Sequence, residues 1–164
     1  GVDIMRRFTL IAPDCARVYS SAWENTGFNL VEAGTLDEPG QRPDVFLWHW
    51  SGENDLPVPA VLSLLPRLIV IVCARGEQIT ISPDLSEIYS LQSFAGRDTG
   101  FTICSRLEGE VSVPDWNLYS NEGEISREEQ IKAVAGAVYR FLLEDVIRET
   151  AEWCGHMSSV VGHM

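Results

Sequence analysis

The apolar run Val45–Trp50, VFLWHW, constrains the fold of this chain more than any other segment. Only His49 interrupts it, Pro43 precedes it, and Ser51–Gly52 follows it as a turn signal. A strand without polar alternation is buried on both faces, as in a parallel sheet covered by helices. We therefore predict the central strand of an α/β sheet, with His49 near the carboxyl edge where such sheets bind ligands.

Strand and helix patterns alternate along the rest of the chain. Strands are predicted at Arg7–Ala12, Phe28–Ala33, Leu68–Ala74 and Gly100–Cys104, and helices at Cys15–Asn25, Pro57–Leu65 and Ser86–Phe94. Leu107–Glu124 is predicted to be a long loop that could hold a short strand. This order predicts a three-layer, doubly wound fold of the flavodoxin-like type, with five parallel strands.

The last element is the clearest helix. Ser126 and Glu129 have the spacing of a capping box. An apolar stripe with helical spacing follows: Ile131, Val134, Ala135, Val138, Leu142 and Val146. The helix could continue to Trp153, which is longer than the fold requires.

Length and composition indicate one domain. The chain has 164 residues, 45% of them hydrophobic, which is enough for one core. We assign residues 5–154 to it and expect residues 1–4 and 155–164, with their repeated Gly-His-Met, to come from cloning. No leader or membrane-length run is visible, so a cytoplasmic protein is expected. Four widely spaced cysteines without a C-x-x-C pair predict reduced thiols and no zinc site.

The charge of the chain narrows the choice of partners. A net charge of −12 opposes binding along a nucleic-acid backbone, which needs clustered Lys and Arg. We therefore expect a protein partner or a second copy of the chain, with no direct contact to nucleic acid or membrane and no cofactor.

Three segments resemble the receiver domains of two-component response regulators. Asn25–Thr35, NTGFNLVEAGT, is similar to the receiver helix end that leads into the second strand. Pro43–Leu47, PDVFL, resembles the approach to the phosphorylated aspartate, and Leu68–Glu77, LIVIVCARGE, resembles the fourth strand and its turn. The resemblance covers roughly residues 6 to 105.

The residues at the receiver's reactive positions differ from the family pattern. Ala12 and Pro13 stand where receivers have their acidic pair, which leaves Asp14 one position late. His49 stands at the phosphoacceptor position and Cys73 at the position of the Thr or Ser. The only lysine, Lys132, lies in the last helix, so Arg106 alone could stand in for the family's lysine. Without metal carboxylates, nucleophile and cation, phosphoryl transfer loses its means of catalysis.

The resemblance therefore implies an atypical receiver domain that is not an enzyme. Such a domain would act independently of phosphorylation, through protein contact or dimerisation, as part of a larger transcriptional regulator. Receivers use their fourth helix, fifth strand and last helix for this. The matching residues here are Ile88, Leu91, Phe94, Phe101, Val138, Leu142 and Val146.

Two other functions stay open at the level of sequence. The first is a flavodoxin-like protein that binds a small molecule near His49, Ser51, Cys73 and Arg75. The second is an acidic inhibitor or immunity-type protein that blocks a basic target.

His49 raises two narrower hypotheses. It could form a nucleophilic pair with Cys73, because both residues lie toward the carboxyl ends of strands that should be neighbours. A metal site could combine His49 with Asp14, Cys73, Glu53 and Asp55, although no ligand spacing supports one. The simpler interpretation is a histidine hydrogen-bonded to a neighbour at a strand end, and the simpler interpretation of Cys73 is a buried structural thiol.

Overall fold

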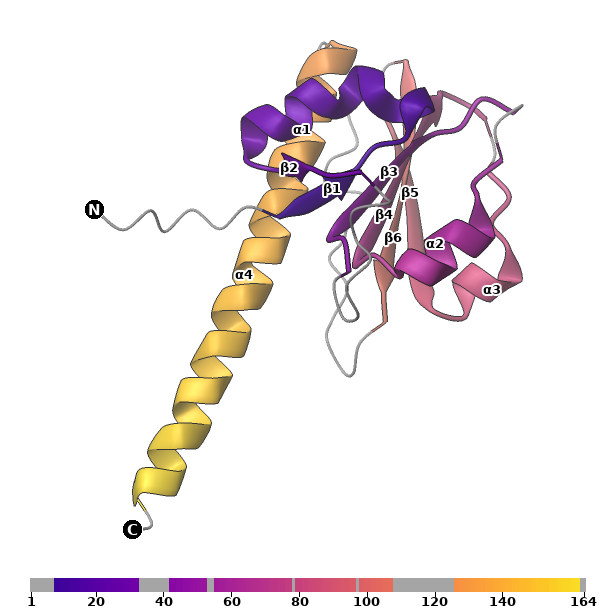
Figure 1. Ribbon diagram of the computed structural model, residues 1–164. Coiled ribbons are helices and arrows are strands. Elements are labelled where there is room, and N and C mark those ends of the chain that lie inside the picture. Colours follow the sequence, from indigo (N-terminus) through magenta and orange to yellow (C-terminus); the bar gives the residue numbers. More distant parts are fainter. Residues whose placement is uncertain are drawn as a thin grey trace.

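The computed structural model describes residues 8–32, 42–52, 55–77, 79–96, 98–107 and 126–162 and shows a mixed α/β fold (Figure 1). One sheet contains β1 (Thr9–Ile11), β2 (Asn29–Leu30), β3 (Val45–His49), β4 (Leu68–Ala74), β5 (Tyr89–Ala95) and β6 (Thr99–Arg106). The helices are the 3-10 helix η1 (Asp14–Tyr19), α1 (Ser20–Thr26), α2 (Val58–Leu64), α3 (Pro83–Ser86) and α4 (Arg127–Gly162).

The sheet is mixed, and its strand order is β2-β1-β3-β4-β6-β5. β1 to β4 are parallel to one another, whereas β6 is antiparallel to both β4 and β5. The predicted α/β class is confirmed. The predicted sheet of five parallel strands is wrong, because the chain ends its sheet with a hairpin whose returning strand inserts between β4 and β5.

The error has a local cause in the segment predicted as helix Ser86–Phe94. Ile88, Leu91 and Phe94 recur at a spacing of three, which suits a helix face. The segment is instead β5, preceded by the single-turn α3. Pairing decides the matter, because β5 pairs with β6 along its whole length and the rings of Phe94 and Phe101 stack across the two strands at 5.2 Å.

Helices cover the two faces of the sheet in separate layers (Figure 1). β4 is apolar and buried on both sides: Leu68, Val70 and Val72 belong to the core under η1, α1 and α4, while Ile69 and Ile71 belong to the core with residues of α2 and α3. This is the continuous apolar strand that the sequence predicted at Leu68–Ala74. Trp48 and Trp50 pack against the second core, as their alternation on one strand indicates.

Helix α4 packs along the sheet with its amino-terminal half and then extends past it (Figure 1). The amide of Glu129 donates to the Ser126 hydroxyl at 3.3 Å. The predicted stripe is buried from Ile131 to Leu142. Buried Asp145 accepts from both Arg67 and Arg148, which attaches α4 to the start of β4. Among the described residues no helix combines the length and apolar character needed to cross a membrane.

Most of the predicted partner-contact residues are not available at the surface. Phe94, Phe101, Val138 and Leu142 are buried in this chain's own core. Ile88, Leu91 and Val146 are partly buried and pack against the two cores. The receiver-type interface fails because its proposed fourth helix is a strand and its last helix turns the apolar stripe inward.

Several predictions lie outside the described residues. They concern Glu53, nearly all of the loop Leu107–Glu124, and residues 1–4. The division into one domain at residues 5–154 and cloning-derived ends stays a prediction; α4 itself continues through residue 162.

Candidate functional site: the carboxyl edge of the sheet

The parallel strands end at an edge where the strand order changes direction between β1 and β3. In open α/β sheets this edge is the usual place for ligands. His49 and Cys73 both end here, on the neighbouring strands β3 and β4. His49 pairs with Val72, so its side chain shares the face of Val72, and Cys73 lies on the opposite face. The predicted pair of Cys73 and His49 is therefore wrong, because the sheet separates the two side chains.

On one face, His49 contacts Tyr19 from η1. The Tyr19 hydroxyl lies 2.8 Å from His49 Nδ1, and the two rings stack with centroids 5.4 Å apart. Burial raises the pKa of Tyr19 above its ordinary value of 10.0, and the charge of Arg127 partly opposes this. Tyr19 is thus a neutral phenol that holds the imidazole in place. This matches the simpler interpretation of His49.

The remaining receiver-like positions do not form a site with His49. Ala12 is buried in the core, Pro13 precedes η1, and exposed Asp14 lies 3.9 Å from Arg17. Arg106 lies at the opposite edge of the sheet, where its guanidinium donates to the Leu65 carbonyl at 2.7 Å. The predicted role of Arg106 is wrong because β6 runs antiparallel and ends beside the start of β4.

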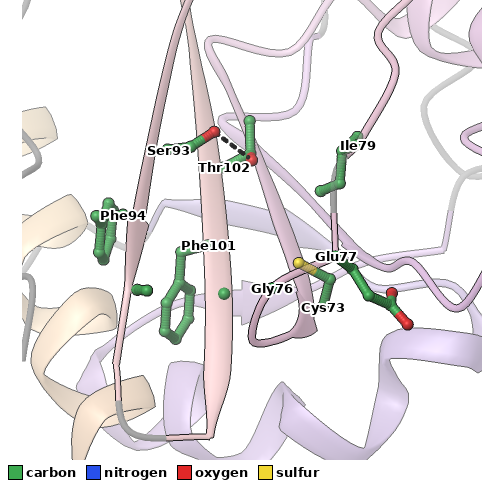
Figure 2. Close-up of a pocket in the computed structure, with 10 residues that line it drawn as sticks. Cys73, Gly76, Glu77, Ile79, Ser93, Phe94, Phe101 and Thr102 are labelled. Carbon is green, nitrogen blue, oxygen red and sulfur yellow. Dashed lines mark hydrogen bonds between the residues drawn. The ribbon is translucent and has the colours of Figure 1, made fainter. Parts of the chain in front are cut away.

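On the other face, Cys73 lines a cavity of about 590 Å³, which we call the Cys73 pocket (Figure 2). Its wall combines a thiol, a carboxylate, two hydroxyls, apolar side chains and small residues. It is lined by Cys73, Gly76, Glu77, Ile79, Ser93, Phe94, Ala95, Gly100, Phe101 and Thr102. The volume suits a small organic ligand.

The register of the hairpin shapes this pocket. Gly100 pairs directly with Cys73, and a Cβ at Gly100 would lie only 2.9 Å from the Cys73 sulfur. Ser93 and Thr102 are paired in the β5–β6 ladder, and their hydroxyls lie 2.9 Å apart (Figure 2). The rings of Phe94 and Phe101 belong to the core on the far side of the sheet. A glycine therefore leaves space next to the thiol, with a polar hydroxyl pair nearby.

The Cys73 thiol is not an activated nucleophile. Burial raises its pKa above the ordinary 9.0, the negative charge of Glu77 raises it further, and a backbone hydrogen bond at Gly100 acts in the opposite direction. The thiol is consequently neutral near pH 7, whereas reactive cysteines have a lowered pKa.

A smaller hollow of about 290 Å³ adjoins the same segment. It is lined by Trp50, Asp55, Leu56, Val58, Ile79, Thr80, Ile81 and Ser82. Ile79 lines both hollows, so the two hollows share part of their wall.

Of the four residues predicted to bind a ligand, Cys73 lines the larger hollow. Ser51 and Arg75 are exposed and are not among the described lining residues of either hollow, and His49 lies on the other face. In the described segments no group of three His, Cys, Asp or Glu side chains could hold a metal, and the predicted ligands Asp14, Cys73 and Asp55 are not brought together.

Sequence reasoning missed Glu77, Ser93, Gly100 and Thr102 as site residues. The last three face the pocket only because β5 and β6 form an antiparallel hairpin. The sequence pattern instead predicts a helix at Ser86–Phe94, so it does not bring these residues together. Alternation of Ser93 with Phe94, and of Thr102 with Phe101, was the available signal for a two-sided strand.

Comparisons with known proteins give limited matches. No protein-family model matches the chain, and no curated protein matches it. Among solved structures, the proposed methyltransferase yhhF from Escherichia coli is similar with a TM-score of 0.33 and 14% identity, over 60% of this chain and 61% of that one. The proposed methylase HI0767 from Haemophilus influenzae has a TM-score of 0.33 and 12% identity, over 64% of this chain and 82% of that one.

These findings correct the functional predictions. The similar structures are described as methyltransferases, which contradicts the receiver resemblance and the regulatory function. It also contradicts the alternatives of a flavodoxin-like protein with its site near His49 and of an acidic inhibitor or immunity-type protein. The prediction that the chain is not an enzyme is contradicted by the same comparison. The strand order is also not that of five parallel strands. TM-scores of 0.33 transfer no activity, so methyl transfer is not carried over to this chain.

Proposed function

We propose that this chain binds a small organic molecule in the Cys73 pocket. A single observation carries the proposal: a cavity of about 590 Å³ with mixed polar and apolar walls at the carboxyl end of β4. The site lies on the opposite face from His49, so it differs from the one that the sequence suggested. A substrate would occupy the same space, so the proposal includes an enzyme.

The local structure supports binding by the described side chains. Gly100 keeps the floor open beside Cys73, while the Ser93 and Thr102 hydroxyls offer lone pairs and protons. The neutral thiol contributes an apolar, polarizable surface. Such a wall fits a ligand with an apolar body and one or two polar groups.

The experiment uses Cys73 as a reporter. Cys15→Ser and Cys154→Ser remove the two more accessible thiols, and Cys104, which is fully buried, serves as an internal silent control. A fragment library is screened by thermal shift, since a ligand of the folded state raises Tm. Each hit is then added during alkylation with iodoacetamide. Hits that occupy the pocket should slow alkylation of Cys73 by about fivefold or more.

A substitution that fills the pocket tests the same claim from the protein side. Ser93→Trp places a large ring at an exposed pocket position and should abolish the thermal shift. Glu87→Trp, at an exposed position outside the pocket, is the matched control and should leave the shift unchanged. Hits that bind both variants equally and leave Cys73 alkylation unchanged would overturn the proposal.

We also propose that a second copy of this chain contacts the last helix. Ile147 is 59% exposed, and Ala151 and Cys154 are also exposed; the spacing of four and three residues puts the three side chains on one helix face. Mild oxidation should then produce a covalent dimer through Cys154, and Ile147→Lys should reduce its yield. A monomer by sedimentation at high concentration would contradict this contact.

We also propose that the protein is located in the cytoplasm. All four cysteines are free, and reduced thiols are typical of reducing compartments. Fractionation of cells that express the full chain tests it directly.

A further inference from the structure

We infer that the ligand of the Cys73 pocket is a small organic cation, most simply a primary amine with an apolar body. This inference rests on the proposed function and adds the charge of the ligand. The geometry points to it because, among the described lining residues of the pocket, Glu77 is the one charged side chain and no Lys or Arg is present.

The carboxylate of Glu77 has no ion-pair partner among those that the described structure gives. Its negative charge acts on the Cys73 thiol, so it also acts on a ligand beside that thiol. An ammonium group would neutralise this charge, whereas a phosphate or carboxylate ligand would be repelled by it. Nucleotides are therefore poor candidates for this pocket.

The hydroxyls provide the directional part of recognition. Ser93 and Thr102 can each accept at least one further hydrogen bond after forming the bond between them. An ammonium group has three donors and no acceptor, so it can donate to the two hydroxyl oxygens. The Glu77 carboxylate, which Figure 2 shows turned away from the two hydroxyls, then acts through its charge. A neutral alcohol of the same shape would retain the apolar contacts and lose the attraction to this charge.

The whole chain favours the same charge. A net charge of −12 attracts cations toward the surface and raises their rate of encounter at low ionic strength. This long-range effect is not specific to the pocket, so the test must separate it from Glu77.

Three probes of matched shape make the separation: 3-phenylpropylamine, 3-phenylpropanol and 3-phenylpropanoate. Binding is measured by the slowing of Cys73 alkylation in the Cys15→Ser, Cys154→Ser protein, with calorimetry as a second readout. We expect the amine to bind about fivefold more tightly than the alcohol, and the carboxylate to bind most weakly. The preference should shrink at high salt.

Glu77→Gln and Glu87→Gln form the decisive pair. Both remove one negative charge from an exposed side chain, but only Glu77 lines the pocket. Glu77→Gln should lower the affinity of the amine to that of the alcohol, whereas Glu87→Gln should leave the affinity of the amine above that of the alcohol. If amine and alcohol bind equally in the parent protein, or if both variants change the preference equally, the cation inference is overturned while the pocket stands. If none of the probes and no library fragment protects Cys73, the proposed function itself fails.

Discussion

The two faces of the sheet differ most at its carboxyl edge. On the His49 face, Tyr19, Val72 and Phe101 are buried under η1, α1 and α4. On the Cys73 face, α2 and α3 contribute Val61 and Leu85 to a core with Ile69 and Ile71, and a hollow remains beyond it.

The cause of this difference is the length of the covering helices. α4 has 36 residues, and its amino-terminal half packs against this face, whereas α2 and α3 have only seven and four residues. Ser93 is exposed on the pocket face while its neighbour Phe94 is buried on the other. One face is therefore packed up to the carboxyl edge, and the other leaves the polar side chains of Glu77 and Ser93 exposed there.

The strongest contrast is expected from two neighbouring residues of β6. Phe101→Ala should lower the free energy of unfolding by about 3 kcal/mol, because it removes a fully buried ring and leaves a cavity. Thr102→Ala should cost about 1 kcal/mol, mainly the hydrogen bond to Ser93. Urea denaturation measures both. Equal losses would show that the pocket face is packed as tightly as the helix-covered face.

High pH should destabilise the closed part of the Cys73 face through Cys104. Burial raises the pKa of this thiol from 9.0 to about 12, so the folded chain keeps a proton that the unfolded chain loses above pH 9. The stabilising contribution is complete below pH 9 and decreases as pH rises toward 12, by about 1.4 kcal/mol per pH unit at most.

The measurement is urea denaturation at pH 8 to 10.5 for the parent and for Cys104→Ala. The variant should show a shallower loss of stability with pH, although it starts from a lower value at pH 8. Cys154→Ala, at an exposed thiol, serves as the control. Parallel curves for the parent and Cys104→Ala would contradict the assignment to this thiol.

The sequence predicted the helix-covered face well. Val45–Trp50, Leu68–Ala74 and the stripe from Ile131 to Leu142 have unambiguous patterns, and the structure confirms them as β3, β4 and the buried face of α4. In each case burial of a long apolar pattern determines both the element and its orientation.

The pocket face was not predictable in the same way. Ile88, Leu91 and Phe94 fit a helix or a strand, and only pairing with β6, which follows later in the chain, decides between them. The site depends on that choice, since Ser93, Gly100 and Thr102 meet Cys73 across antiparallel strands. The resemblance to receivers also favoured the helix, which is the wrong alternative. Receivers have only parallel strands, so the resemblance does not predict an antiparallel hairpin.

A smaller effect is expected from the contact that fixes His49. Tyr19→Phe removes the hydroxyl 2.8 Å from Nδ1 and keeps the stacked ring, so it should cost about 1 kcal/mol of stability. A double-mutant cycle with His49→Leu isolates this bond as a coupling energy of similar size. Ligand binding in the Cys73 pocket should not change in either variant, because the sheet lies between them. A loss of binding would instead show that residues on both faces contribute to one site.

The smallest effect on stability is expected at Ser93. Its hydroxyl is on the exposed edge strand β5, so water can replace the bond to Thr102 after Ser93→Ala, and the free energy of unfolding should change by about 0.5 kcal/mol or less. Binding of 3-phenylpropylamine should nevertheless weaken by about threefold, because one acceptor of the ammonium group is lost. Thermal unfolding and the Cys73 alkylation assay measure the two quantities on the same sample. A variant that loses stability but keeps its affinity would place Ser93 with the structural residues, and would reduce the polar side of the pocket to Glu77 and Thr102.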